Sequence, residues 1–445
     1  MVSVHSVNAG FGIATKYFNA DVSNVNKVLP AAVDELTRRA NKPGQFLSWI
    51  DLPKEQLKRV DKIYDLVAKS KKQTDSKVLT VLGIGGSKHP VEHMLSINGL
   101  NINKDKVLFF SDVDSTSLAR FVNRLDNDVT KSNFLVVSKS GSTFETKDGM
   151  LRFKQLLEDA YINKGYDKNQ AKEMAAKHMI AVTDKNPASS ELRRLSNSEN
   201  WAGDLFIHDD VGGRFSALDD HVLFALADAG MKKQDMIKML KAAQGMSETA
   251  LSKDLSKNDP LMQAAFWVNS RLNGIRTTVH QYMGSLFEDT VNWHSQMQNE
   301  SVKNTLKQIA KVPDAMHHSS EAHFNPANKY AYALTSPVDH GAARENAAGY
   351  INALNKSYSQ SGPFFNETAE TAGLGLRPDT AGALTQSRAF STVYQELIDK
   401  SMKQEKLPDV LDSVLQPHVE FYKKNLKPQP GEPDVVVAGR FSKLA

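Results

Sequence analysis

The sequence predicts an α/β protein built on parallel sheets flanked by helices. Its 445 residues suffice for two or three domains at roughly 150 residues each. Short apolar runs rich in β-branched residues alternate with longer segments in which apolar residues recur every three or four positions. Strand, helix and strand at this interval indicate βαβ units, so ligands are expected in loops beyond the carboxyl ends of the strands.

The first half of the chain carries the clearest alternation. Strands are predicted at residues 77–83, 106–112, 133–138 and 178–184, and helices between them at 117–126 and 145–161. In the second half, the helical period dominates residues 215–311, apart from a strand at 277–283. A further strand is expected at 329–336, and helices at 344–359 and 387–405. A second α/β unit is therefore expected.

The termini differ from this pattern. The first 50 residues are expected to form a helical extension, and the segment after Asn425 is a proline-rich linker. The predicted division is an extension at 1–50, a first α/β domain at 51–205, a second at 206–405, and a C-terminal helix and tail at 406–445.

Composition excludes several classes of function. Lys plus Arg number 55 against 51 for Asp plus Glu, and a net charge of +4 is too weak for a nucleic-acid binder. The absence of cysteine excludes disulfides, thiolate nucleophiles and cysteine-ligated metals. No signal peptide and no run of about 18 to 20 apolar residues is present, so we expect a cytoplasmic protein without a membrane partner.

The first predicted strand ends in the glycine loop, GIGGS at residues 83–87, which includes Gly86 and Ser87. Glycines allow backbone N–H groups to approach an anion closely because no Cβ intervenes. A GxGxxG motif would need glycine where Lys88 stands, and the Walker spacing is not met either. Taken alone, the loop fits an anion site and a plain tight turn equally well.

The third predicted strand ends in the serine loop, residues 138–143, followed at once by helical spacing. Four of its side chains carry hydroxyls: Ser138, Ser140, Ser142 and Thr143. A helix start directs free amides and the positive end of its dipole at one point, and hydroxyls add further donors. Helix capping requires one hydroxyl rather than four, so the loop predicts a site for a phosphate monoester.

At this loop the sequence resembles a known superfamily. Ser-x-Ser-Gly-x-Thr is similar to the sugar-phosphate loop of sugar isomerase (SIS) domains, and SKSGSTFET with GIGGS upstream resembles the glucose-6-phosphate isomerase family. The resemblance implies two SIS domains, each a doubly wound parallel sheet, with the substrate between them and C-terminal helices around them. The loop also occurs in hexosamine-phosphate synthases and in sugar-phosphate-sensing regulators.

Later motifs follow the order of the isomerase family. The arginine turn, residues 212–216 with Arg214, is similar to the family's GGRFS, where an arginine faces an enediolate. Gln296 precedes Glu300 by four residues, as a Gln precedes the family's catalytic Glu, which moves a proton between C2 and C1. The Glu-Ser pair is kept, but Val302 and Lys303 replace the family's Gly-Lys.

The ring-opening and C-terminal positions are less well preserved. The resemblance assigns ring opening to His318, with His317 as the second choice, and places Gln416 and Lys423 at the substrate. Leu415, His418 and Tyr422 stand where the family has Asp, Gly and Gly, so this end also fits an ordinary amphipathic helix.

The resemblance thus implies a complete set of roles. Glu300, His318, Lys423 and Arg214 are catalytic; the residues that bind substrate are Gly86, Ser87, Ser138, Lys139, Ser140, Thr143, Gln296 and Gln416. It implies no metal or organic cofactor, a small sugar phosphate as substrate, and a homodimer. Two alternatives remain: an isomerase of another phosphorylated aldose, such as a mannose phosphate, and a sugar-phosphate sensor with weak or no catalysis.

Overall fold

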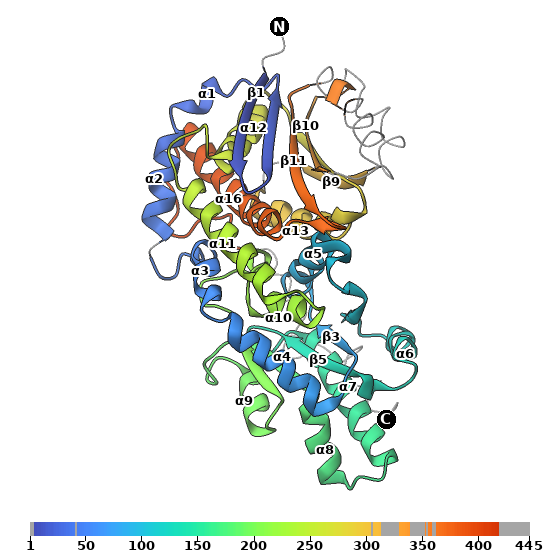
Figure 1. Ribbon diagram of the computed structural model, residues 1–445. Coiled ribbons are helices and arrows are strands. Elements are labelled where there is room, and N and C mark those ends of the chain that lie inside the picture. Colours follow the sequence, from blue (N-terminus) through green and yellow to red (C-terminus); the bar gives the residue numbers. More distant parts are fainter. Residues whose placement is uncertain are drawn as a thin grey trace.

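The computed structural model describes residues 4–40, 42–303, 306–312, 329–338, 352, 355–357 and 362–417. In these residues the chain forms two sheets, one above the other along the long axis of the molecule (Figure 1). The upper sheet contains the N-terminal strands, and the lower sheet contains β3 and β5. The α/β class with largely parallel sheets and flanking helices is confirmed.

The lower sheet is entirely parallel, with the order β4-β3-β5-β6-β7. Its strands are β3 (Val78–Leu82), β4 (Val107–Phe110), β5 (Ser132–Val137), β6 (Met179–Thr183) and β7 (Gly203–Phe206). Every residue of β5 and β6 is buried, which explains their unbroken apolar runs. The four predicted strands are confirmed, whereas β7 has only four residues, one of them an aspartate, and was not predicted.

Helices cover the lower sheet. They are α4 (Val60–Thr74), α5 (His89–Asn98), α6 (Ser115–Arg124), α7 (Phe144–Asn163), α8 (Lys168–Lys177), α9 (Glu191–Ser198) and α10 (Asp220–Asp228). Local sequence fixes several of their starts, since Asp114 caps α6 and Asp167 forms a capping box with Gln170 at α8. Both helices expected here, α6 and α7, are confirmed.

The upper sheet is mixed, with the order β1-β2-β11-β10-β8-β9. Its strands are β1 (Val4–Gly10), β2 (Ile13–Phe18), β8 (Thr277–Met283), β9 (Leu306–Val312), β10 (Tyr330–Val338), β11 (Phe364–Ala372) and the short β12 (Gly375–Leu376). The strands β8 to β11 are mutually parallel, and β2 joins β11 in antiparallel fashion. The strands expected at 277–283 and 329–336 are confirmed.

The expected helical extension is wrong for residues 4–18, which form the hairpin β1-β2. Buried and solvent-facing residues alternate along β2, which is the strand period rather than the helical one. Gly10 and Gly12 take positive φ values of 75° and 74° at the turn, which suits glycine. Helices follow only afterwards, as α1 (Ser23–Asn26), α2 (Leu29–Ala40) and α3 (Leu52–Leu57).

The helical expectation for residues 285–311 is half correct. Helix α13 (Thr290–Ser301) is confirmed, but β9 replaces helix at the end of the run. Leu306, Ile309 and Ala310 also fit a helical spacing, and parallel pairing with β8 overrides it. The helix expected at 344–359 lies mostly outside the described residues, and the one at 387–405 is confirmed as part of α16 (Pro378–Met402).

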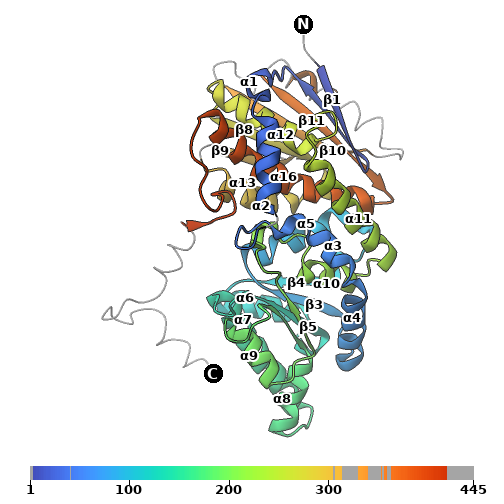
Figure 2. The ribbon, with the colours of Figure 1, turned by 90° about the vertical axis from the view of Figure 1, so that its left-hand side faces the viewer.

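Helix α16 is the centre of the upper half. It packs against α11 (Lys233–Ala250) and α12 (Asp259–Leu272), beside which it runs in both views (Figures 1 and 2). Helix α5 lies between the two sheets and packs against both α10 and α13. One apolar core therefore joins the two halves, and it includes Leu79, Val91, Leu240 and Phe390. Among the described helices, none is long and apolar enough to cross a membrane.

Candidate active site

Two of the candidate loops meet where the lower sheet changes direction. The chain moves from β3 outward to β4, then returns to β5 on the other side of β3, so β3 and β5 are neighbours. The glycine loop follows β3 and the serine loop follows β5. Crevices at the carboxyl ends of strands, where the strand order reverses, are the usual ligand sites of such sheets.

The serine loop is held by its own hydroxyls and by the next strand. Ser138 is buried; its amide donates to Val182 O at 3.0 Å, and its Oγ accepts from the Gly141 amide at 3.1 Å. The Ser138 Oγ also donates to Thr143 Oγ1 at 3.3 Å. Gly141 has a φ of +78°, and a Cβ there would lie 2.4 Å from Leu192 N, so only glycine fits this bend.

Helix α7 begins directly at this loop. Thr143 is its N-cap residue, yet no side chain makes a capping hydrogen bond there. Amides at an uncapped helix start retain their donor capacity, and the helix dipole adds positive potential at the same point. Ser140 and Ser142, whose hydroxyl oxygens are 2.7 Å apart, are exposed beside it, as is Lys139. The loop therefore offers amide, hydroxyl and ammonium donors to an anion.

The glycine loop lies beside the end of β5 on one side and the arginine turn on the other. A Cβ on Gly83 would lie 3.4 Å from Val137 O, next to the start of the serine loop. A Cβ on Gly86 would lie only 2.5 Å from the backbone of Gly213, so the two backbones pack closely because both residues are glycine. A Cβ on Gly85 would approach Gln296 Nε2 to 3.3 Å.

Arg214 is buried, and all three of its guanidinium nitrogens donate hydrogen bonds. Nε donates to Ser301 Oγ at 2.8 Å, and Nη2 to the carbonyls of Ser413 and Leu415 at 2.5 and 3.2 Å. Nη1 faces Glu300 Oε2 at 3.2 Å and Gln416 Oε1 at 3.5 Å. Burial lowers the pKa of Arg214, and the charge of Glu300 opposes this.

Glu300 lies between Arg214 and Gln296. Its Oε1 accepts from Gln296 Nε2 at 3.0 Å, across one turn of α13, while Oε2 faces the guanidinium. Its side chain is 23% exposed, in contrast to 2% for Arg214, so solvent or a ligand can reach the carboxylate. The result is a partly open carboxylate beside a buried cation.

Comparison with known proteins assigns the chain to a family. A sequence model described as phosphoglucose isomerase matches residues 54–325, which is more than half of the chain. The chain belongs to the phosphoglucose isomerase family. This membership covers the serine loop, the arginine turn and helix α13.

Relatives and solved structures agree with the family assignment. A glucose-6-phosphate isomerase of Shouchella clausii is 28% identical over 93% of this chain and 92% of its own length. A glucose-6-phosphate isomerase of Clostridioides difficile is 31% identical, over 65% of this chain and 61% of its own length. A glucose-6-phosphate isomerase structure from Chlamydia trachomatis covers 95% of this chain and 88% of its own, at 18% identity and a TM-score of 0.73, which supports the same fold.

The structure brings four of the predicted site residues of this family member into direct contact. Arg214 faces Glu300 and Gln416, and Gln296 donates to Glu300 beside Gly85 of the glycine loop. The predicted residues His318 and Lys423, and the alternative His317, lie outside the described residues.

Sequence analysis missed the partners that hold Arg214. Ser301 was noted only as part of the Glu-Ser motif, and its adjacency to Glu300 was the available signal. The carbonyls of Ser413 and Leu415 had no signal, because carbonyl contacts do not depend on side-chain identity.

One group among the described residues has the donor atoms for a metal ion. Atoms of His208, Asp219 and Asp220 lie within 4.8 Å of one another. Asp219 accepts from His208 Nδ1 at 2.6 Å, and Asp220 accepts from Arg59 Nε at 2.9 Å and Gln56 Nε2 at 3.0 Å. The Arg59 cation and the hydrogen bonds from His208 and Gln56 already satisfy the two carboxylates, so the group is better described as a hydrogen-bonded cluster around an ion pair.

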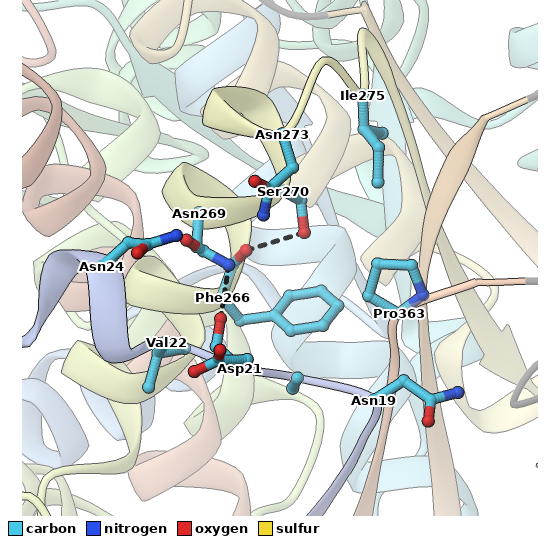
Figure 3. A pocket seen from close by; sticks show the side chains of 11 residues that line it. Asn19, Asp21, Val22, Asn24, Phe266, Asn269, Ser270, Asn273, Ile275 and Pro363 are labelled. Carbon is cyan, nitrogen blue, oxygen red and sulfur yellow. Dashed lines mark hydrogen bonds between the residues drawn. The ribbon is translucent and has the colours of Figure 1, made fainter. Parts of the chain in front are cut away.

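A pocket of about 210 Å³ lies away from the candidate site (Figure 3). Its lining residues include Asn19, which follows the end of β2, and Ile275 and Pro363, which precede the starts of β8 and β11. Asn269 and Phe266 from α12 complete this part of the lining. None of the lining residues is Lys or Arg. This pocket therefore lacks the cationic groups that a sugar phosphate needs.

Proposed function

We propose that this protein interconverts glucose 6-phosphate and fructose 6-phosphate. The observation that carries the proposal is the Glu300 carboxylate, partly exposed and oriented by Gln296, next to the buried Arg214 guanidinium. Proton transfer between neighbouring carbons needs a base and a cation that stabilises the intermediate, and this pair supplies both. Family membership and the names of the relatives support the same activity.

The serine loop would bind the 6-phosphate. Ser138, Ser140 and Thr143 contribute hydroxyls, and the backbone amide of Lys139 and the start of α7 add donors. Binding the phosphate fixes the sugar chain, so that C1 and C2 reach the neighbouring loops. Gly86, Ser87, Gln296 and Gln416 would contact the sugar hydroxyls, as expected from their sequence motifs.

Glu300 would carry the proton. It takes the proton from C2 of the open-chain aldose, the C1–C2 bond becomes double, and the carbonyl oxygen on C1 gains negative charge. The resulting cis-enediolate lies against Arg214, whose cation stabilises it. Glu300 then returns the proton to C1 while the hydroxyl proton on O2 passes to O1 and a carbonyl forms at C2, which yields the ketose without gain or loss of electrons.

The remaining steps and properties are proposed from the family resemblance. His318, together with Lys423, would open the sugar ring before proton transfer. We further propose that the protein is a cytoplasmic homodimer and that it needs no metal or organic cofactor, because Arg214 supplies the positive charge.

The test is a coupled assay of the purified full-length protein with fructose 6-phosphate, in which NADPH formation reports glucose 6-phosphate. We expect turnover with this substrate at least about tenfold faster than with mannose 6-phosphate. Faster conversion of mannose 6-phosphate would make the protein an isomerase of another aldose. Tight binding of fructose 6-phosphate without turnover would make it a sensor, and either outcome rejects the proposal.

A further inference from the structure

Trp293 connects the helix of the candidate base to the turn of the candidate cation. It lies on α13, two helical turns before Glu300, and only 1% of it is exposed. Its indole Nε1–H donates to the backbone carbonyl of Arg214 at 3.0 Å. A buried indole that is bonded in this way fixes where the Arg214 backbone lies relative to α13.

The other end of this link is His93 on α5. The imidazole of His93 stacks on the Trp293 ring, with centroids 4.0 Å apart and planes 11° apart. Its Nδ1 is 2.9 Å from Thr290 Oγ1, also on α13, and its Nε2 is 3.0 Å from Thr385 Oγ1 on α16. His93 therefore joins three helices, and the first of them starts directly after the glycine loop.

The stack contains no net charge. Burial, reinforced by the nearby Arg388 cation, lowers the pKa of His93 to about 3. A neutral imidazole has one donor and one acceptor nitrogen, and the two threonine hydroxyls can satisfy both. The link between α5, α13 and the arginine turn is thus independent of pH in the neutral range.

The arginine turn needs an anchor of this kind. Gly212 and Gly213 precede Arg214, and glycine restricts the backbone least. The hydrogen bonds of the Arg214 side chain fix the guanidinium, but the indole holds the backbone carbonyl of the same residue. Loss of that bond leaves a buried carbonyl without its partner and frees the turn to shift against Glu300.

We propose that Trp293 and His93 are positioning residues that set the distance between Arg214 and Glu300. This inference rests on the proposed function, because the positioned groups are its base and its cation. Neither residue touches substrate in this proposal. Their effect should appear in turnover rather than in substrate affinity, since the serine loop is built from a different part of the chain.

The test compares Trp293→Phe with Trp201→Phe. Both substitutions remove an indole hydrogen bond of a buried tryptophan, since Trp201 Nε1 donates to Glu199 Oε2 at 2.9 Å, and the next residue, Ala202, bonds to the start of β6, at the end of the sheet away from the loops. We expect Trp293→Phe to lower kcat about fivefold to tenfold with KM within about twofold, and Trp201→Phe to leave both unchanged. His93→Gln, which retains a donor and an acceptor, should retain more kcat than His93→Leu.

Hydrogen exchange gives a second measurement that does not depend on turnover. The amides of Phe215 and Ser216 donate to Gly212 O and Gly213 O, and they should exchange faster in Trp293→Phe than in Trp201→Phe. Equal exchange and equal kcat in the two variants would overturn the inference. If the wild-type protein does not interconvert the sugars, the proposed function fails, while the exchange rates still decide whether Trp293 holds the turn.

Discussion

Arg214 and Arg388 are two of the buried arginines that face a glutamate in the described part of the chain, and their two pairs are built differently. In the Arg214–Glu300 pair, the glutamate side chain is 23% exposed; in the Arg388–Glu367 pair, it is fully buried. Glu367 accepts from Gln263 Nε2 at 2.8 Å and Thr335 Oγ1 at 3.0 Å in addition to Arg388. Its oxygens are therefore surrounded by protein donors, whereas one side of Glu300 is open.

The pKa shifts of the two arginines have opposite signs. Burial lowers the pKa of Arg214, and its single carboxylate does not offset that effect. Burial also acts to lower the pKa of Arg388, but Glu367 and Tyr282 together outweigh it, and the pKa is raised. Arg388 is thus compensated within the fold, whereas the effect of burial on Arg214 is only partly offset by the one carboxylate that faces it.

Substitution of the open glutamate should have the largest effect on turnover. Glu300→Gln should lower kcat about a thousandfold because the amide cannot take a proton, with KM within about twofold. The free energy of unfolding should fall by no more than about 1 kcal/mol, since the carboxylate is partly solvated. Steady-state kinetics and urea unfolding measure both quantities, and residual activity above a few per cent would remove Glu300 from the role of base.

The same substitution in the closed pair should act on stability instead. Glu367→Gln leaves Arg388 buried without its counter-ion, so the free energy of unfolding should fall by about 3–5 kcal/mol. Folded Glu367→Gln protein, assayed well below its melting temperature, should keep kcat within about twofold of the wild type. A stable variant with lost turnover would contradict the division between a structural and a catalytic pair.

A second buried acid, Asp259, is linked to Glu367 through Gln263 Nε2 and gives a pH-dependent test. Asp259 accepts from Thr15 Oγ1 and Tyr17 Oη, both at 2.8 Å, and so anchors the N-terminal hairpin. Burial, reinforced by Glu367, raises the pKa of Asp259 to about 6. This exceeds the value of about 3.9 in an unfolded chain, so folding favours the protonated acid. Its contribution to stability is fully present below about pH 4 and is lost as the pH rises through about 6.

Asp259→Asn should remove this dependence. The stability of the wild type relative to Asp259→Asn should fall by about 1–3 kcal/mol between pH 4 and pH 7, measured by urea unfolding at each pH. Asp204→Asn, at an exposed aspartate that pairs with Arg193, is the control for the general effect of replacing a carboxylate by an amide on stability at each pH. A constant difference across this range would show that Asp259 is not protonated preferentially on folding.

The sequence predicted the lower sheet better than the upper one for a physical reason. Strands β3 to β6 are buried on both faces and read as continuous apolar runs, which have few other interpretations. The hairpin β1-β2 and strand β9 lie at or near the edges of the upper sheet, where polar and apolar residues mix and the spacing of Leu306 and Ile309 also suits a helix. Their structure is decided by pairing, of β2 with β11 and of β9 with β8.

For the candidate site as well, the sequence predicts only those residues that a local pattern identifies. Arg214, Gln296 and Glu300 stand in short motifs, so local sequence identified them. The role of Trp293 depends on a backbone carbonyl far away in the chain, and that of the Ser413 carbonyl depends on the path of the backbone alone. Such contacts arise only when the chain folds, and no local pattern predicts them.

The smallest predicted effect concerns the serine loop. Several of its hydrogen-bond donors are exposed, in contrast to the buried Arg388–Glu367 pair. Thr143→Val keeps the size of the side chain but removes the hydroxyl that accepts from Ser138 Oγ. We expect KM to rise about tenfold with kcat within about twofold, because phosphate binding is shared by the substrate and the transition state. Thr37→Val makes the same change at an exposed threonine on α2, in the upper half of the molecule, and it should leave KM unchanged. Equal KM values for the two variants would mean that Thr143 does not contact the phosphate.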